Sequence, residues 1–79
     1  MATKRQQQRD PRREVLRHLG EKVRSVRHER GLTQESLADS LDISVTYVSL
    51  IERGGRNPPY TTVIAIANAL GVSPRDVIE

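Results

Sequence analysis

The 79-residue chain has 13 Lys and Arg residues against 10 Asp and Glu, a net charge of +3, and no cysteine. A chain of this length folds as one domain that buries only about 60 to 65% of its unfolded surface, which leaves no room for a second, catalytic domain. The lack of cysteine excludes disulfides and thiolate metal sites, and no apolar run reaches the length of a membrane span. We therefore expect a cytoplasmic binding protein rather than an enzyme, with no cofactor, no metal and no membrane partner.

Basic charge is concentrated in the first part of the chain. Residues 1–30 hold ten Lys and Arg against four Asp and Glu, whereas residues 31–79 hold three against six. This asymmetry favours an acidic polymer as the partner, and nucleic acid above all, although a solvated basic tail would give the same pattern. Residues 1–10 lack apolar periodicity, and we expect them to form a flexible basic arm that can lie in a DNA minor groove.

A first helix is expected to begin at Pro11, because proline is favoured at the first helical position. It should end at Gly31, since glycine readily takes the left-handed conformation that stops a helix. The apolar residues between these ends recur at steps of three and four and predict one core-facing stripe: Leu16, Leu19, Val23 and Val26.

Two short helices joined by a tight turn are expected next. Thr33 and Ser44 are both suitable N-cap residues, and each precedes apolar residues at helical spacing, which predicts helices over about 34–41 and 45–53. So short a connection forces the two helices to cross closely, and Ala38 is the small side chain expected at the crossing. This layout is a helix-turn-helix, whose second helix, called the reading helix below, enters the DNA major groove.

A loop and two more helices complete the expected fold. Pro58 and Pro59 forbid a regular helix, so a fourth helix should begin near Tyr60 and end at Gly71. The segment 73–76 resembles a capping box with proline at the first helical position, and it predicts a last short helix. The fold class is therefore all-α, a compact five-helix bundle over residues 11–79.

The outer face of the reading helix follows from its inner face. Val48 and Ile51 have the spacing of core residues, so the positions half a turn away should face outward: Val45, Thr46, Ser49, Leu50 and Arg53. Exposed apolar residues here can pack on thymine methyls, and the hydroxyls can bind base edges or phosphates. Scattered apolar residues also occur on surfaces without a function, which is the alternative for Val45 and Leu50 taken singly.

Three segments resemble, in their order along the chain, the Cro and phage-repressor class of helix-turn-helix proteins. They are GLTQESLADSL (31–41), VTYVSLIERGGRNP (45–58) and IANALGVSP (66–74). The resemblance covers about residues 20–79 and implies a lambda-repressor-like DNA-binding domain. The segment TYVSLIERGGRN (46–57) is in particular similar to the controller proteins of restriction-modification genes. The resemblance also implies an ion pair between Arg27 and Glu52 that ties the reading helix to the first helix.

The resemblance implies individual roles at the DNA as well. Gln34 matches a position that contacts a phosphate, and Tyr47 matches a tyrosine that either donates to a phosphate or fills the edge of the core. Arg56 and Asn57 match a loop that approaches the backbone or a guanine edge. The complete set of residues expected at the DNA is Gln34, Ser44, Val45, Thr46, Tyr47, Ser49, Leu50, Arg53, Arg56 and Asn57. Positions 45, 46, 49 and 50 hold no Arg or Gln, which argues against direct guanine recognition by the helix and shifts sequence recognition to Arg56, to thymine-methyl contacts and to DNA shape.

The expected function is a transcriptional regulator that binds operator DNA at the nucleoid as a homodimer. It would repress by covering promoter elements or activate by touching RNA polymerase. The alternative is an antitoxin-type regulator whose main partner is a toxin protein. The contacts between the two copies of the chain are expected from apolar residues that one small domain cannot cover: Tyr60, Ile64, Val72, Val77 and Ile78. The two histidines, His18 and His28, have no further ligand at metal-site spacing.

Overall fold

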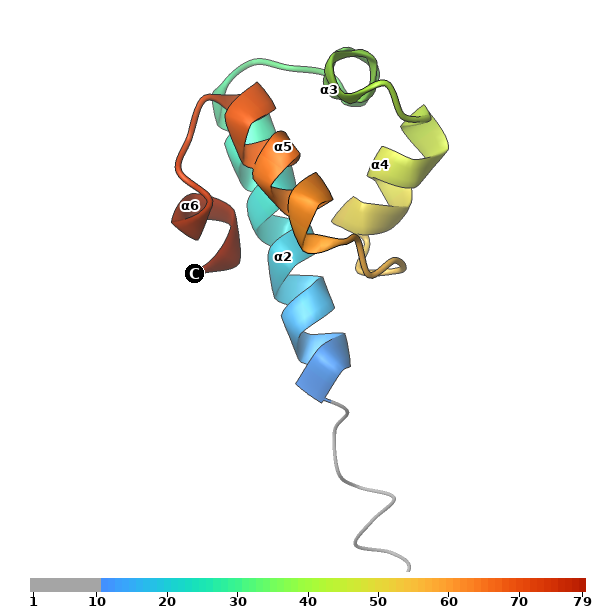
Figure 1. Cartoon of the computed structure of the whole chain (residues 1–79), viewed down its shortest axis with the longest axis vertical. Helices are drawn as coiled ribbons and strands as arrows, with labels where there is room; N and C mark the ends of the chain where they lie inside the picture. Colours follow the sequence, from blue (N-terminus) through green and yellow to red (C-terminus); the bar gives the residue numbers. More distant parts are fainter. Residues whose placement is uncertain (1–10) are drawn as a thin grey trace, which may run out of the picture.

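The computed structural model describes residues 11–79, which form five helices and no strand (Figure 1). The helices are α2 (Pro11–Glu29), α3 (Gln34–Leu41), α4 (Val45–Glu52), α5 (Tyr60–Leu70) and α6 (Arg75–Ile78). The expected all-α class and all five expected helices are therefore confirmed. The basic arm expected over residues 1–10 lies outside the described residues.

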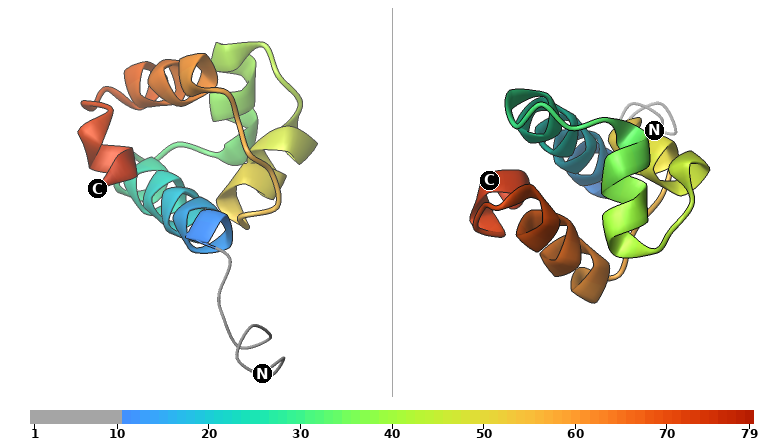
Figure 2. Two further views of the ribbon diagram at one scale, coloured as in Figure 1. Left: turned by 60° about the horizontal axis from the view of Figure 1, so that its bottom comes forward. Right: turned by 90° about the horizontal axis from the view of Figure 1, so that it is seen from above.

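The helices surround one core, with the long helix α2 as the scaffold. In the left view of Figure 2, α2 lies below the core and α5 above it, α6 closes one side, and α3 and α4 close the other. Packing contacts join α2 to α4, α5 and α6, and they join α3 to α4 and α5. The reading helix α4 thus packs against the scaffold on one side and against α3 on the other.

The ends of α3 and α4 are fixed by side-chain caps. The Thr33 hydroxyl accepts a hydrogen bond from the Ser36 amide at 3.0 Å, and the Ser36 hydroxyl accepts one from the Thr33 amide at 3.1 Å. Ser44 caps α4 by accepting from the Tyr47 amide at 3.0 Å. Between the helices, Asp42 takes the left-handed conformation (φ 57°, ψ 45°), which turns the chain within two residues. The predicted tight turn is therefore present, and Asp42 makes it.

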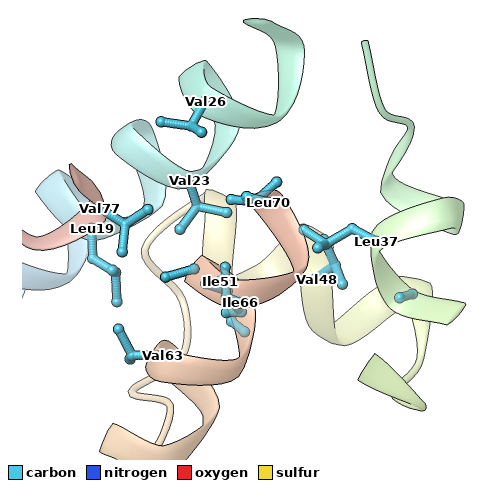
Figure 3. Close-up of a cluster of buried hydrophobic side chains, with 12 residues drawn as sticks. Leu19, Val23, Val26, Leu37, Val48, Ile51, Val63, Ile66, Leu70 and Val77 are labelled. Atoms are coloured by element: carbon cyan, nitrogen blue, oxygen red, sulfur yellow. The ribbon is translucent and has the colours of Figure 1, made fainter. Parts of the chain in front are cut away.

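The core consists of the apolar stripes of all five helices (Figure 3). The inner stripe of α5 is buried, and Ala38, the small residue expected at the crossing of α3 and α4, has no exposed surface. Ile43 is half-buried in the turn and packs against this core. The buried apolar residues are Leu19, Val23, Val26, Leu37, Ala38, Val48, Ile51, Val63, Ile66, Ala67, Leu70 and Val77.

One dimer prediction is wrong, because Val77 belongs to this core. Its exposed fraction is 0%, whereas its neighbour Ile78 is 46% exposed. The short helix α6 packs against α2, and adjacent residues of a helix point to different sides, so only one of the two can face solvent. Val77 cannot contact a second copy without unfolding α6.

A glycine in the middle of α2 lies directly against the main chain at the end of the reading helix. A Cβ atom at Gly20 would lie 2.5 Å from the carbonyl oxygen of Glu52, and it would lie even closer to that of Ile51. No side chain can occupy this position while the end of α4 stays where it is. Glycine therefore lets the main chain at the end of α4 rest directly on α2.

We predict that Gly20→Ala destabilises the fold by about 2 to 3 kcal/mol, since an added methyl group would displace rigid main chain. Helix propensity acts in the opposite direction, because alanine in a helix interior is favoured over glycine by about 1 kcal/mol. Gly55→Ala is the control: its Cβ would meet nothing closer than Leu50, at 3.5 Å. Urea unfolding measures both variants, and equal stability for the two would contradict the close contact.

Candidate nucleic-acid interface

The reading helix α4 exposes one face near its N-terminal end. Thr46 is exposed and Val45 is 37% exposed, whereas Val48 and Ile51 on the opposite side are 2% exposed. Ser49 and Leu50 are half-buried, so they border this face rather than stand out from it. The structure thus brings these four candidate residues together on one side of α4, where short side chains dominate.

Ser44 and Tyr47 lie at the edge of that face. The Ser44 hydroxyl caps α4, although the side chain remains exposed. Tyr47 is half-buried and packs against the hydrophobic core. Of the two roles considered for Tyr47, filling the edge of the core is therefore the one that a structural contact supports.

The loop after α4 is held close to both helices. Gly54 has a φ of 77°, and a Cβ on it would lie 3.2 Å from the Cα of Arg17 in α2. The Gly55 amide donates to the Leu50 carbonyl at 2.8 Å. Arg56 and Asn57 follow as exposed residues. Both lie on a loop whose start is fixed against α2 and α4, and Asn57 borders a hollow with Val15 and Leu16 of α2.

A buried ion pair joins α2 to the end of α4. Arg27 donates from Nε to Oε2 of Glu52 at 2.7 Å and from Nη2 to Oε1 at 3.0 Å. The two side chains are 8% and 2% exposed. Arg27 Nη1 also donates to the Leu32 carbonyl at 2.8 Å, and Gln34 Nε2 donates to Glu52 Oε1 at 3.0 Å. One carboxylate therefore connects the scaffold, the first residue of α3 and the last residue of the reading helix.

The contacts of this network keep Arg27 in its charged form. The hydrogen bond to Glu52 raises the pKa of the Arg27 guanidinium above its ordinary value, and it outweighs burial, which acts in the opposite direction. Arg27 is therefore charged whenever the protein is folded. Within residues 11–79, every buried side-chain nitrogen and oxygen has a hydrogen-bond partner.

The fold and this site match known DNA-binding regulators. A family model described as helix-turn-helix matches residues 23–77. The chain belongs to this helix-turn-helix family. Control protein C.BamHI of Bacillus amyloliquefaciens is 43% identical over 62 residues, which make up 77% of this chain and 76% of that protein. Two other relatives are longer proteins, of which the matched regions make up 47% and 42%.

Solved structures give the same result. The restriction-modification controller protein C.AhdI from Aeromonas hydrophila superposes with a TM-score of 0.75 at 35% identity, over 78% of this chain and 94% of that one. The controller protein C.Esp1396I, solved as a tetramer in complex with its natural 35 base-pair operator, gives a TM-score of 0.70 at 29% identity, over 82% of this chain and 96% of that one. The expected resemblance to controller proteins is therefore confirmed, and with it a regulator rather than an enzyme.

The remaining candidate dimer residues of this helix-turn-helix domain lie on α5, α6 and the segment between them. Tyr60 is 71% and Ile78 46% exposed, while Ile64 and Val72 are half-buried. A hollow of about 320 Å³ lies between Tyr60, Ile78 and the exposed Val15 of α2. Val15 falls outside the core stripe of α2, so no signal in the sequence marks it.

His18 Nε2 lies 2.9 Å from the Glu79 carbonyl oxygen, which ties α2 to the end of α6. In the described part of the chain, no group of three or more His, Cys, Asp or Glu residues is placed to hold a metal ion. Nor is any helix among residues 11–79 long and apolar enough to cross a membrane.

We predict that Glu52→Ala destabilises the domain by about 3 kcal/mol, because it leaves the buried Arg27 without its partner. Arg27→Met should cost a similar amount, and the double variant should cost less than the sum, since no uncompensated charge remains. Arg17→Ala is the control: among the described residues this exposed arginine of the same helix pairs with the half-buried Glu14 and the exposed Glu21, and its loss should leave stability unchanged. Additive effects in the Arg27–Glu52 cycle would show that the pair acts as two independent residues.

Proposed function

We propose that this chain is a sequence-specific transcriptional regulator of the restriction-modification controller type, which binds operator DNA as a homodimer. The observation that carries the proposal is the exposed face of α4, held on the scaffold by a buried ion pair and by the contact at Gly20. A helix that must enter the major groove needs one free face and a fixed orientation, and α4 has both. The similarity to controller proteins supports the same function.

In this proposal the contacts divide between bases and backbone. Val45 and Thr46 would lie against base edges and thymine methyls, with Ser49 and Leu50 beside them. Arg56, on the loop, would reach a guanine, for which a long bidentate donor is suited. Gln34, Ser44, Tyr47, Arg53 and Asn57 would contact the sugar-phosphate backbone.

Regulation would follow from where the dimer sits on the DNA. At the nucleoid, a protein of this size can cover a promoter element or present its surface to RNA polymerase, and the sign of regulation depends on the position of the operator. The reported relatives are regulators and controller proteins, which favours this function over that of an antitoxin with a toxin as its main partner.

The first test separates base recognition from anchoring. Footprinting of the DNA upstream of its own gene provides the operator. Thr46→Ala and Arg56→Ala should reduce the preference for operator over random DNA by about 1 to 3 kcal/mol, because each loses a base contact. Gln34→Ala should weaken binding to both DNAs equally. An unchanged preference in Arg56→Ala would make Arg56 a backbone or loop residue only.

The second test concerns the dimer. Ile64→Asp and Ile78→Asp should shift the protein from dimer to monomer in sedimentation at micromolar concentration, since each places a charge in an apolar interface. Ser25→Asp, on the exposed side of α2 away from the core, adds the same charge and should stay dimeric. The reading helices of a two-fold dimer lie about 34 Å apart, so the operator should be a pseudo-palindrome with half-sites one helical turn apart.

If both interface variants remain fully dimeric, the dimer uses another surface. A monomeric wild type that nevertheless protects a symmetric site would show that the dimer forms only on DNA.

A further inference from the structure

A polar hollow lies beside the C-terminal end of the reading helix. It measures about 320 Å³ and is open to solvent between α2, α3 and α4. Its lining consists of Arg24, Arg27, Gln34, Ser49, Glu52 and Arg53. Arg24 and Arg27 belong to α2, whereas Arg53 directly follows the last residue of α4. No sequence motif indicates that these three arginines lie together.

The charges in this hollow are not balanced. Arg27 and Glu52 neutralise each other in the buried pair. Arg24 is exposed, and its side chain makes no hydrogen bond or ion pair with any other residue of 11–79. Arg53 is also exposed; its Nε donates a hydrogen bond to the carbonyl oxygen of Ser49, one turn earlier, at 3.4 Å, and its charge has no carboxylate partner among residues 11–79. Two positive charges therefore remain available to an anion.

The positions of the two arginines are set by rigid main chain. Arg24 lies one turn after Gly20 on α2, and Arg53 directly follows Glu52, whose carbonyl rests on Gly20. The close contact at Gly20 thus brings Arg24 and Arg53 to the same hollow. Gln34 adds a third donor, because its amide nitrogen carries two hydrogens and Glu52 accepts only one of them.

We propose that this hollow binds one backbone phosphate of DNA, held by Arg24 and Arg53 with Gln34 as an additional donor. Arginine is suited to this because its planar guanidinium donates two parallel hydrogen bonds to a phosphate. The inference rests on the proposed function, because this phosphate would lie in the DNA backbone beside the major groove that α4 enters. The proposed contact makes Arg24 of the scaffold helix a DNA-contacting residue, which no sequence motif indicates.

A purely structural role for the two arginines predicts a different result. Positive side chains near the C-terminal end of α4 stabilise that helix end electrostatically. In that case removal of Arg24 would lower the free energy of unfolding and leave the salt dependence of DNA binding unchanged. The two roles can therefore be separated by measuring stability and salt dependence on the same variant.

The experiment measures the affinity for operator and for random duplex DNA as a function of KCl concentration. Arg24→Gln should make the slope of log K against log salt less negative by about 0.9, the value for one phosphate contact, on both DNAs. It should also weaken binding about tenfold at a fixed salt concentration, as expected for one charge-assisted hydrogen bond. Lys22→Gln is the matched control, because it removes the same charge two positions away, where the side chain points to another side of α2.

Neutral methylphosphonates, introduced one at a time into the operator, identify the phosphate. At one position in each half-site, the substitution should weaken the wild type but cause no further loss in Arg24→Gln. Equal losses in both proteins at every position, or an unchanged salt slope in Arg24→Gln, would overturn the phosphate site while leaving the proposed function intact. A wild type that binds no duplex DNA would overturn the proposed function and this site together.

Discussion

The contact between Gly20 and the end of α4 is the constraint on which the arrangement of this domain depends. At that point the main chain of one helix lies on the main chain of another, with no side chain between them. A contact through side chains can adapt by changing rotamers, but main chain against main chain leaves only one separation. The angle at which α4 leaves the scaffold is thereby fixed at its C-terminal end, while the turn at Asp42 fixes its N-terminal end.

The Arg27–Glu52 pair adds orientation to this contact. A hydrophobic contact at the same place would hold α4 against α2 but would allow it to rotate, whereas two parallel hydrogen bonds define a direction. Because Glu52 also accepts from Gln34, the same carboxylate fixes the side chain at the start of α3. A fully satisfied buried network of this kind contributes rigidity more than net stability. Rigidity is what a helix that recognises DNA requires.

Most of the fold could be predicted from the sequence because its signals are local. The caps Thr33 and Ser44, the helix-ending Gly31 and Gly71, and the apolar spacing each act within a few residues. Features that depend on a partner helix could not be predicted in the same way. A glycine inside a strong helical pattern indicates a close approach, but not to which element. In the four-residue helix α6, no periodicity tells whether the core holds Val77 or its neighbour, and only its packing on α2 decides.

The candidate site shows the same division. The resemblance supplied the candidate contact residues on α3, α4 and the loop because they are close together in short motifs. Arg24 stands alone on α2, and its proposed role depends on Arg53 across the helix contact. In the proposed complex, the short side chains of α4 would let its backbone approach the bases closely. Long arginines would then act beside it: Arg56 from the loop, and Arg24 with Arg53 from the hollow at the end of α4. Recognition would thus depend on how firmly the scaffold sets the depth of α4 in the groove, so that the buried contacts at Gly20 and Glu52 would influence binding without touching DNA.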